Sequence, residues 1–276
     1  MLTIDPAVLR ADEEAHVAPH EDRLPVHAVQ DTAYAGVPVR VYLPVPEPAD
    51  GVIVYVHGGA FFLGSLETHD HVARELAVAT GRTVVSVGYR RAPEAAYPAG
   101  LDDCYAVVRH VLGAGDTVAL VGDSSGGNFV ATLAAMAHDD GLGGVTHQVL
   151  LYPSLDLDFD EDRYPSLREN AVGHGLETAA LKPFNAFYVD SGADPADPRV
   201  SPIKRADLSG LPPALVVTAE LDPLRDEGEL YAARLREAGV HATVSRYAGA
   251  GHGFVQHQGS LPEFHRVYDE IAGFLG

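Results

Sequence analysis

Short apolar runs alternate with longer segments of helical spacing from residue 52 to the end of the chain. The apolar runs occupy residues 52–56, 83–89, 118–121, 149–152, 215–219 and, more weakly, 243–247. Between them, apolar residues recur at helical spacing in residues 69–79, 101–112, 128–138, 226–238 and 261–275. A continuous apolar run is typical of a strand that is buried on both faces of a parallel sheet. The alternation therefore predicts an α/β fold, with a mostly parallel central sheet flanked by helices on both faces.

The N-terminal part of the chain has a different pattern. Residues 26–33 and 37–43 have the composition of strands and join at Gly36, which predicts a hairpin. Residues 6–21 are weakly helical, and residues 44–51 read as a loop.

A second break in the alternation lies at residues 156–202, which are rich in acids, prolines and glycines. This segment contains one helical stretch, at about 178–188. It is too long for a plain loop in a compact domain, so we expect a lid or cap over one edge of the sheet. The chain is then one domain, residues 1–276, with cap elements from about 1–25 and 156–202.

Charge and cysteine content narrow the class of protein. The chain carries 19 Lys+Arg against 39 Asp+Glu, a formal net charge of -20, and phosphate backbones and anionic lipid surfaces repel such a chain. We therefore expect no nucleic-acid or membrane partner. Cys104 is the single cysteine, which excludes an intrachain disulfide and a zinc site built on several cysteines. The N-terminus lacks signal-peptide features and no apolar run approaches membrane-spanning length, so we expect a cytoplasmic protein.

The first candidate for chemistry is the run Gly-Asp-Ser-Ser-Gly at residues 122–126, between an apolar run and a helical pattern. A serine flanked by glycines at a sharp strand-to-helix turn has the arrangement of a nucleophile elbow. Glycine leaves room where a Cβ would clash, and the following helix places its positive end near the serine. The central residue, Ser124, is the candidate nucleophile; a glycine-rich turn without chemistry is the alternative.

A serine nucleophile needs a base and an acid that orients the base. Histidine suits the first role because its pKa lies near neutral pH, and His252 lies in a glycine-rich loop after the last predicted strand. Asp222 directly follows the strand at 215–219 and suits the second role. Glu220 and Asp226 are alternatives, and Asp222 has an ordinary structural role as a helix N-cap. The order Ser124, Asp222, His252 is that of the α/β-hydrolases.

Candidate oxyanion donors follow the strand at 52–56, in the run His-Gly-Gly-Ala-Phe at residues 57–61. Such glycines free backbone N–H groups to point at one spot. Two such donors and the N–H of Ser125 would stabilise a tetrahedral intermediate, each by roughly 3 kcal/mol of barrier. A plain strand-ending turn is the alternative.

Together these motifs resemble the bacterial branch of the hormone-sensitive-lipase-like esterases, which have the α/β-hydrolase fold. The resemblance runs from about residue 37 to the C-terminus and rests on His-Gly-Gly-Ala-Phe-Phe-Leu-Gly-Ser at 57–65, Tyr-Arg-Arg-Ala-Pro-Glu at 89–94, Tyr-Pro-Ala at 97–99, Asp-Asp at 102–103, the run at 122–126, Asp-Pro-Leu-Arg-Asp at 222–226 and His-Gly-Phe at 252–254. It implies an eight-stranded sheet, a mostly helical cap, and hydrolysis of esters with short acyl chains without a cofactor.

Carried over by position, the resemblance implies that Ser124 is the nucleophile, His252 the base and Asp222 its orienting acid. It implies that Gly58, Gly59 and Ser125 supply the oxyanion donors. The sequence departs from the family pattern at three positions: it has Ala60 in place of a third glycine, Ser125 in place of alanine and Arg91 in place of leucine. Alanine at a positive φ costs on the order of 1 kcal/mol, so we expect Ala60 to adopt a conformation that alanine tolerates.

Other functions remain open on this scaffold. The same machinery serves an amidase or an arylformamidase, which a comparison of ester and formamide substrates would separate. A non-catalytic small-molecule binder would fail to react with a serine-directed phosphonate. The nearest candidate for a metal site is His69-Asp70-His71, which fits better as the start of the following helix. A homodimer through the last edge strand, common among similar proteins, is a further expectation.

Overall fold

A computed structural model describes residues 4–256 and 262–276. These residues form an eight-stranded sheet in the order β1-β2-β4-β3-β5-β6-β7-β8. The strands are β1 (Ala28–Tyr34), β2 (Val37–Leu43), β3 (Ala49–Val56), β4 (Arg82–Val87), β5 (Val118–Asp123), β6 (Val145–Leu151), β7 (Ala214–Leu221) and β8 (Ala242–Gly251). The predicted mostly parallel sheet is confirmed, because the neighbours from β4 through β8 all pair in parallel.

The first two strands form the predicted hairpin. Ala35 and Gly36 connect them, and both have positive φ values, of 50° and 84°. A two-residue loop with positive φ at both positions matches the right-handed twist of the flanking strands. The hairpin joins the sheet through β2, which runs antiparallel to β4.

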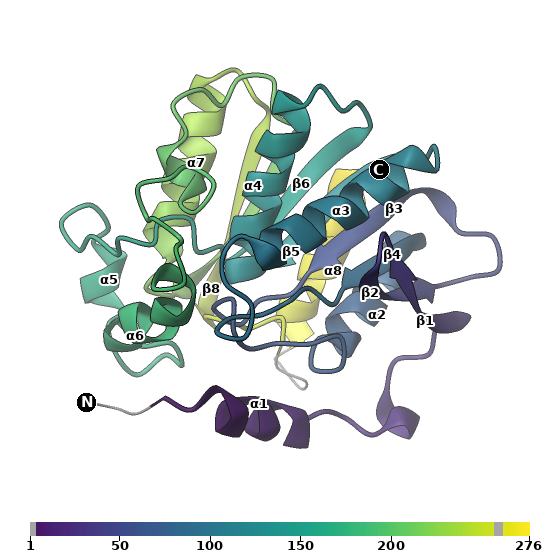
Figure 1. The fold of residues 1–276 in the computed structure, drawn as a ribbon, viewed down its shortest axis with the longest axis horizontal. Coiled ribbons are helices and arrows are strands. Elements are labelled where there is room, and N and C mark those ends of the chain that lie inside the picture. Colours follow the sequence, from purple (N-terminus) through teal and green to yellow (C-terminus); the bar gives the residue numbers. More distant parts are fainter. Residues whose placement is uncertain (1–3, 257–261) are drawn as a thin grey trace.

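Helices cover both faces of the sheet, as predicted (Figure 1). They are α1 (Pro6–Ala15), α2 (Asp70–Thr80), α3 (Ala99–Gly113), α4 (Ser125–Asp139), α5 (Ser166–Glu169), α6 (Thr178–Val189), α7 (Arg225–Glu237) and α8 (Pro262–Leu275). Helices α2 and α8 share one apolar cluster with the sheet, and α3, α4 and α7 share the other. Single turns of 3₁₀-helix follow at His20–Asp22 and Pro202–Lys204.

Strand β3 shows why the central strands read as continuous apolar runs. Val54 and Val56 belong to the cluster with α3, α4 and α7, whereas Ile53 and Tyr55 belong to the cluster with α2 and α8. Successive side chains of a strand point to opposite faces, so a strand covered on both sides has no polar positions. All four of these side chains are buried.

Several element boundaries differ from the prediction. The helix expected at 6–21 ends at Ala15. Strand β3 begins at Ala49, inside the expected loop, and β8 continues to Gly251. Helix α4 begins at Ser125, three residues early, because the tight turn after β5 overrides the low helix propensity of glycine there. Residue 261, the expected start of the last helix, lies outside the described residues.

Residues 156–202 contain two helices, α5 and α6, connected by irregular backbone. Asp156 organises the first part of this segment from a fully buried position. Its carboxylate accepts hydrogen bonds from the Tyr164 hydroxyl at 2.8 Å and from the Asp158 N–H at 3.3 Å, and pairs with Lys204 Nζ at 3.1 Å and with Arg163. Hydrogen bonds and ion pairs of the buried Asp156 carboxylate therefore hold this part of the chain, which has irregular backbone.

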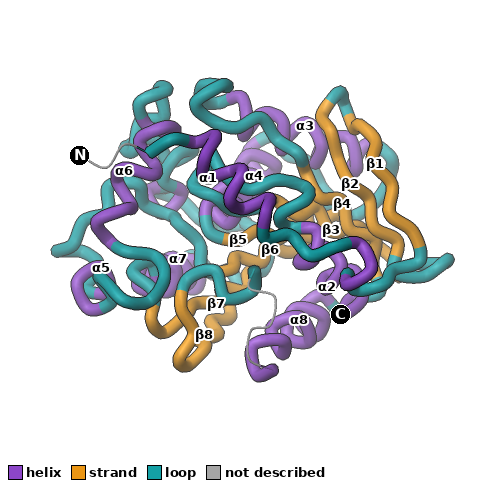
Figure 2. The backbone as a smooth tube through the Cα atoms, turned by 90° about the horizontal axis from the view of Figure 1, so that it is seen from below, coloured by secondary structure: helices purple, strands orange, loops and turns teal. Residues whose placement is uncertain are grey.

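Helix α1 passes close to the ends of β5 and β6 in the view of Figure 2, and α6 lies to one side of it. None of the residues of α1 is buried. Polar contacts hold this helix instead: Arg10 donates to the carbonyl oxygens of Phe62 and Ala92, both at 2.7 Å, and Glu13 accepts from the Gly64 N–H at 3.0 Å. The N-terminal helix is thus attached to the loop that follows β3.

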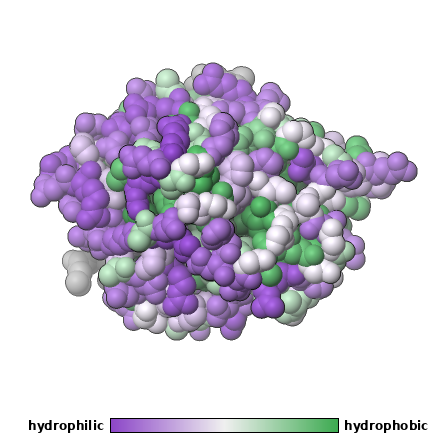
Figure 3. All heavy atoms as spheres, turned by 90° about the horizontal axis from the view of Figure 1, so that it is seen from above, coloured by the Kyte–Doolittle hydropathy of each residue, from purple (hydrophilic) through white to green (hydrophobic). Residues whose placement is uncertain are grey.

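The end of the molecule away from α1 is mainly hydrophilic, with separate apolar patches (Figure 3). None of the helices in the described ranges is both long enough and apolar enough to span a bilayer. Strand β8 lies at one edge of the sheet. The homodimer expected through this edge strand stays a prediction.

Candidate active site

Ser124 lies between β5 and α4 in a backbone conformation that is unusual for a residue with a side chain, φ 52° and ψ −120°. Its N–H donates to the Leu151 carbonyl at 2.8 Å, which ties the turn to the next strand. A Cβ on Gly122 would lie 2.5 Å from the Gly126 carbonyl oxygen, and one on Gly126 would lie 2.1 Å from the Val56 carbonyl oxygen. The two glycines therefore allow the close approach that presents the serine.

Replacing Gly126 with alanine is expected to lower the free energy of unfolding by about 3 kcal/mol or more, because backbone atoms surround the new methyl group and cannot move aside as a side chain could. Equilibrium unfolding in urea measures the effect. Gly113→Ala in α3 is the matched control, since a Cβ there meets nothing within 4 Å and alanine favours the helix. Equal unfolding free energies for the two variants would contradict the steric argument.

The structure brings Ser124, His252 and Asp222 together. The Ser124 Oγ lies 2.9 Å from His252 Nε2, and His252 Nδ1 lies 2.8 Å from Asp222 Oδ2. Asp222 directly follows β7 and His252 directly follows β8, so the carboxyl ends of β5, β7 and β8 supply the three groups. Asp222 is fully buried and its other oxygen accepts the Leu224 N–H at 2.9 Å, which fixes the carboxylate.

The two alternative acids face other partners. Glu220 accepts the Gly249 N–H at 2.7 Å, and Asp226 accepts the Ser166 N–H at 2.7 Å. Asp222 is not the helix N-cap that its alternative interpretation predicted, because the N-cap of α7 is Leu224; the contact of Asp222 with the Leu224 N–H lies in the turn before that helix. Only Asp222 among these three acids is hydrogen-bonded to His252.

Two residues that the sequence did not single out contact His252 and Asp222. The Tyr152 ring packs against the His252 ring with centroids 4.9 Å apart, and Tyr152 itself has a positive φ of 35°. The Asn170 side chain donates to the carbonyl oxygens of Asp222 at 3.0 Å and of Glu220 at 3.1 Å. Tyr152 ends a predicted strand, but nothing in the local sequence connects Asn170 with a strand fifty residues later.

The oxyanion prediction needs a correction at Gly58. The Gly58 N–H donates to Asp123 Oδ1 at 3.0 Å and is therefore engaged inside the protein. The N–H groups of Gly59 and Ala60 donate to no residue in the described ranges, and both residues line the cavity at Ser124. Helix α4 begins at Ser125, whose N–H has no acceptor within the helix. The available donors are those of Gly59, Ala60 and Ser125.

The backbone of this loop also differs from the expectation for Ala60. Ala60 has a φ of 48° and Phe61 a φ of 65°, so both adopt the left-handed conformation that the prediction excluded for Ala60. Tertiary contacts hold the loop in place: the Phe61 ring stacks on Tyr188 at 4.0 Å, and the Phe61 N–H donates to Ser125 Oγ at 3.3 Å. The hydroxyl of Ser125 thus makes a contact that alanine could not make.

Asp123 connects the loops around the nucleophile. Its fully buried carboxylate accepts the Tyr55 hydroxyl at 2.7 Å, the Gly58 N–H at 3.0 Å and the Gln256 side-chain amide. Burial raises the pKa of Asp123, but the charge of His69 and these hydrogen bonds outweigh it and hold the pKa at about 2. The Asp123 carboxylate therefore stays ionised. Through its hydrogen bonds it connects the turn at Ser124 with the loop at residues 57–61 and with Gln256.

His57, the first residue of the oxyanion loop, has a structural position. Burial, with the nearby His69, lowers the pKa of His57 to about 3, so the imidazole is neutral. Its Nδ1 lies 2.8 Å from the Gly58 carbonyl oxygen, and its ring stacks on Tyr89 at 4.3 Å. These contacts of the His57 ring fix the start of the loop that follows β3.

A small cavity of about 140 Å³ opens at Ser124. Leu176, Leu181 and Phe184, from the segment at 156–202, are apolar residues that line it. The cavity therefore combines Ser124 and His252 with several apolar side chains.

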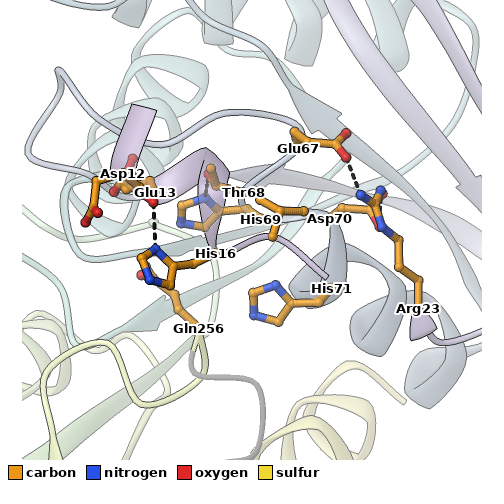
Figure 4. Close-up of a pocket in the computed structure, with 11 residues that line it drawn as sticks. Asp12, Glu13, His16, Arg23, Glu67, Thr68, His69, Asp70, His71 and Gln256 are labelled. Carbon is orange, nitrogen blue, oxygen red and sulfur yellow. Dashed lines mark hydrogen bonds and ion pairs between the residues drawn. The ribbon is translucent and has the colours of Figure 1, made fainter. Parts of the chain in front are cut away.

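A second cavity, of about 510 Å³, lies between α1 and the start of α2 and shares Gln256 with the first (Figure 4). Asp70 on its wall accepts the Tyr42 hydroxyl at 2.8 Å and pairs with Arg74 at 2.6 Å. His69-Asp70-His71 lies at the start of helix α2, as expected. Arg74 pairs with the Asp70 carboxylate, which a metal ion at this position would need as a ligand.

Comparisons with known proteins agree with this geometry. The family described as the alpha/beta hydrolase fold matches residues 53–256. Carboxylesterase NlhH of Mycobacterium tuberculosis is 45% identical over 232 residues, which cover 79% of this chain and 71% of the relative. Esterase LipI of the same species is 36% identical over 278 residues, or 95% of this chain and 85% of the relative.

A solved structure extends the agreement to nearly the whole chain. The hyperthermophilic esterase from Pyrobaculum calidifontis superimposes with a TM-score of 0.88 at 40% identity, over 98% of this chain and 92% of that one. The chain therefore belongs to the hormone-sensitive-lipase-like esterases of the α/β-hydrolase superfamily.

Proposed function

We propose that this protein is a carboxylesterase that hydrolyses short-chain acyl esters through an acyl-enzyme intermediate. The observation that carries the proposal is the hydrogen-bonded series from Ser124 Oγ to His252 Nε2 at 2.9 Å and from His252 Nδ1 to Asp222 at 2.8 Å. A base within hydrogen-bond reach of the nucleophile, itself oriented by a buried acid, is the arrangement that activates a serine hydroxyl. The esterase relatives support the same reaction class.

In the first half of the reaction, Ser124 Oγ attacks the ester carbonyl carbon and its proton passes to His252 Nε2. The bond between that carbon and the alcohol oxygen then breaks, and His252 returns the proton to the departing alcohol. In the second half, water attacks the acyl-enzyme, His252 accepts a proton from it, and the proton goes back to Ser124 as the acid leaves. Asp222 keeps Nδ1 protonated and stabilises the imidazolium throughout.

Negative charge develops on the carbonyl oxygen in both halves. We assign its stabilisation to the N–H groups of Gly59, Ala60 and Ser125, because the Gly58 N–H is committed to Asp123. Each such donor lowers the barrier by roughly 3 kcal/mol. The left-handed backbone at Ala60 belongs to this function, since strained backbone persists where the surroundings fix it at a reactive site.

The size of the cavity supports short acyl chains. A volume of about 140 Å³ is well below that of pockets that hold drug-sized ligands, and Leu181 and Phe184 are among its lining residues. We propose that the segment at 156–202 and the N-terminal residues to about 25 act as the cap that sets this limit.

An acyl-chain profile with nitrophenyl esters from acetate to decanoate tests the proposal. We expect the highest kcat/KM between acetate and hexanoate and a steep fall toward decanoate, because longer chains meet Leu181 and Phe184. A serine-directed phosphonate should label Ser124 stoichiometrically, and an arylformamide in the same assay separates esterase from amidase preference. Absence of labelling together with absence of turnover would overturn the proposal, and fast decanoate hydrolysis would overturn its chain-length part.

A further inference from the structure

The side chain of Ser125 holds the peptide that joins Ala60 to Phe61. The Phe61 N–H donates to Ser125 Oγ at 3.3 Å. Phe61 is 2% exposed and Ser125 is 1% exposed, so water has little access to this hydrogen bond and cannot readily replace it. Ser125 therefore contacts the loop after β3 through its hydroxyl, while its own N–H at the start of α4 is a candidate oxyanion donor.

The two candidate donors of this loop, the N–H groups of residues 59–60, lie between two N–H groups that are held. Before them, the Gly58 N–H donates to Asp123 Oδ1 at 3.0 Å. After them, the Phe61 N–H donates to the Ser125 hydroxyl. The two acceptors belong to the residues on either side of the nucleophile, so the elbow holds the loop at both ends of the donor pair.

The backbone at the second held peptide has a conformation that side chains disfavour. Ala60 has a φ of 48° and Phe61 a φ of 65°. In this left-handed region the Cβ of an L-residue lies too close to the following carbonyl oxygen, so an unsupported loop would seldom adopt it. The Phe61 ring stacks on Tyr188 at 4.0 Å, and the Phe61 carbonyl accepts the Ala92 N–H at 3.0 Å. The N–H of the strained peptide itself is held by Ser125 Oγ.

We propose that the Ser125 hydroxyl is a positioning group for the oxyanion site and that it offsets the strain of the left-handed backbone at Ala60. By holding the Phe61 N–H it fixes the peptide next to the Ala60 N–H, and it thereby keeps that donor directed at the developing negative charge. Ser125 then acts twice: its N–H binds the oxyanion, and its Oγ holds a neighbouring donor in place. This inference rests on the proposed esterase function and adds a positioning role to it.

The strain argument makes the importance of this hydroxyl depend on residue 60. Glycine adopts positive φ about as readily as negative φ, whereas alanine disfavours it. With glycine at position 60, the loop would return to its productive conformation more often without the hydroxyl. A merely structural contribution of Ser125 to the stability of the fold would not depend on residue 60 in this way.

Four forms of the full chain test the proposal: the wild type, Ser125→Ala, Ala60→Gly and the double variant, with kcat and KM measured on nitrophenyl butyrate. We expect Ser125→Ala to lower kcat about 3- to 10-fold, the range of one hydrogen bond, with KM within about twofold of wild type, because the donors act on the transition state. Ala60→Gly alone should keep kcat within about twofold of wild type. In the presence of Ala60→Gly, loss of the Ser125 hydroxyl should lower kcat by less than about twofold.

Thr80→Val is the matched control. Thr80 Oγ1 accepts the Arg82 N–H at 3.3 Å, the same distance as in the Ser125 contact, but Thr80 lies at the end of α2 and does not line the cavity at Ser124. Its loss should keep the wild-type kcat. The fold should survive Ser125→Ala, because alanine keeps the Cβ and favours the helix that begins there. Circular dichroism and urea unfolding check both variants.

A wild-type kcat in Ser125→Ala would overturn the inference, and so would an equal loss of kcat with and without Ala60→Gly or a loss confined to KM. In each case, Ser124-dependent hydrolysis of the ester by the wild type would leave the proposed esterase function standing. A wild-type protein that neither hydrolyses the ester nor is labelled by the phosphonate would instead remove the proposed function and this inference with it.

Discussion

Replacing Ser124 with alanine is expected to lower kcat for a short-chain ester by roughly a million-fold, to the level that binding and the oxyanion donors supply alone. The variant loses Ser124 Oγ, which lies 2.9 Å from His252 Nε2 in the structure. Without that oxygen no acyl-enzyme forms, and water must attack the bound ester directly.

The fold should survive this change, because alanine keeps the Cβ and the N–H that donates to Leu151. Circular dichroism and urea unfolding check this point on the same preparation. Ser209→Ala, at an exposed serine away from the cavity, is the control for preparation and assay and should retain full turnover. Turnover in the Ser124 variant above a few per cent of wild type would remove this serine from the mechanism.

Replacing Asp222 with asparagine is expected to lower kcat by roughly ten-thousand-fold. In the structure, one Asp222 oxygen accepts the Leu224 N–H and the other faces His252 Nδ1. An asparagine keeps its oxygen on Leu224, which turns its NH₂ group toward the imidazole. Nδ1 must then accept a hydrogen bond, so the proton moves to Nε2, and the histidine can no longer accept the proton of Ser124.

The matched variant is Glu220→Gln, which changes the neighbouring candidate acid in the same way. Because Glu220 accepts the Gly249 N–H and makes no contact with His252, we expect kcat within a fewfold of wild type. Measurement of kcat and KM for both variants on one ester decides the assignment. A large loss in the glutamine variant with little loss in the asparagine variant would reverse the roles of the two acids.

The parts of the fold that local sequence determines could be predicted. The central strands are buried on both faces, so their apolar runs stand out, and the hairpin at Gly36 follows from turn residues between two strands. Boundaries set by tertiary contacts could not be predicted in this way. Helix α4 starts at Ser125 because the elbow is held by β3 and β6, although glycines follow in its first turn.

The candidate site divides along the same line. Ser124, Asp222 and His252 each follow a recognisable strand, and the structure places them within hydrogen-bond distance of one another. The direction of a single N–H cannot be read from a glycine run. Gly58 turns its N–H toward Asp123 because that buried carboxylate needs donors, a contact between residues 65 positions apart. The supporting role of Asn170 depends on an equally distant contact.

Helix α1 is attached to the rest of the protein differently from the helices that pack on the two faces of the sheet. It contributes no buried side chain, and Arg10 and Glu13 connect it to backbone atoms of the loop that carries Gly59 and Ala60. Detaching it would therefore expose little apolar surface of the helix itself, and water can replace the hydrogen bonds that are lost. Higher ionic strength weakens the charged contacts that attach this helix. The stability of the sheet and its helices depends chiefly on conditions that weaken hydrophobic burial. The attachment of α1 and the survival of the fold are thus governed by different properties of the solvent.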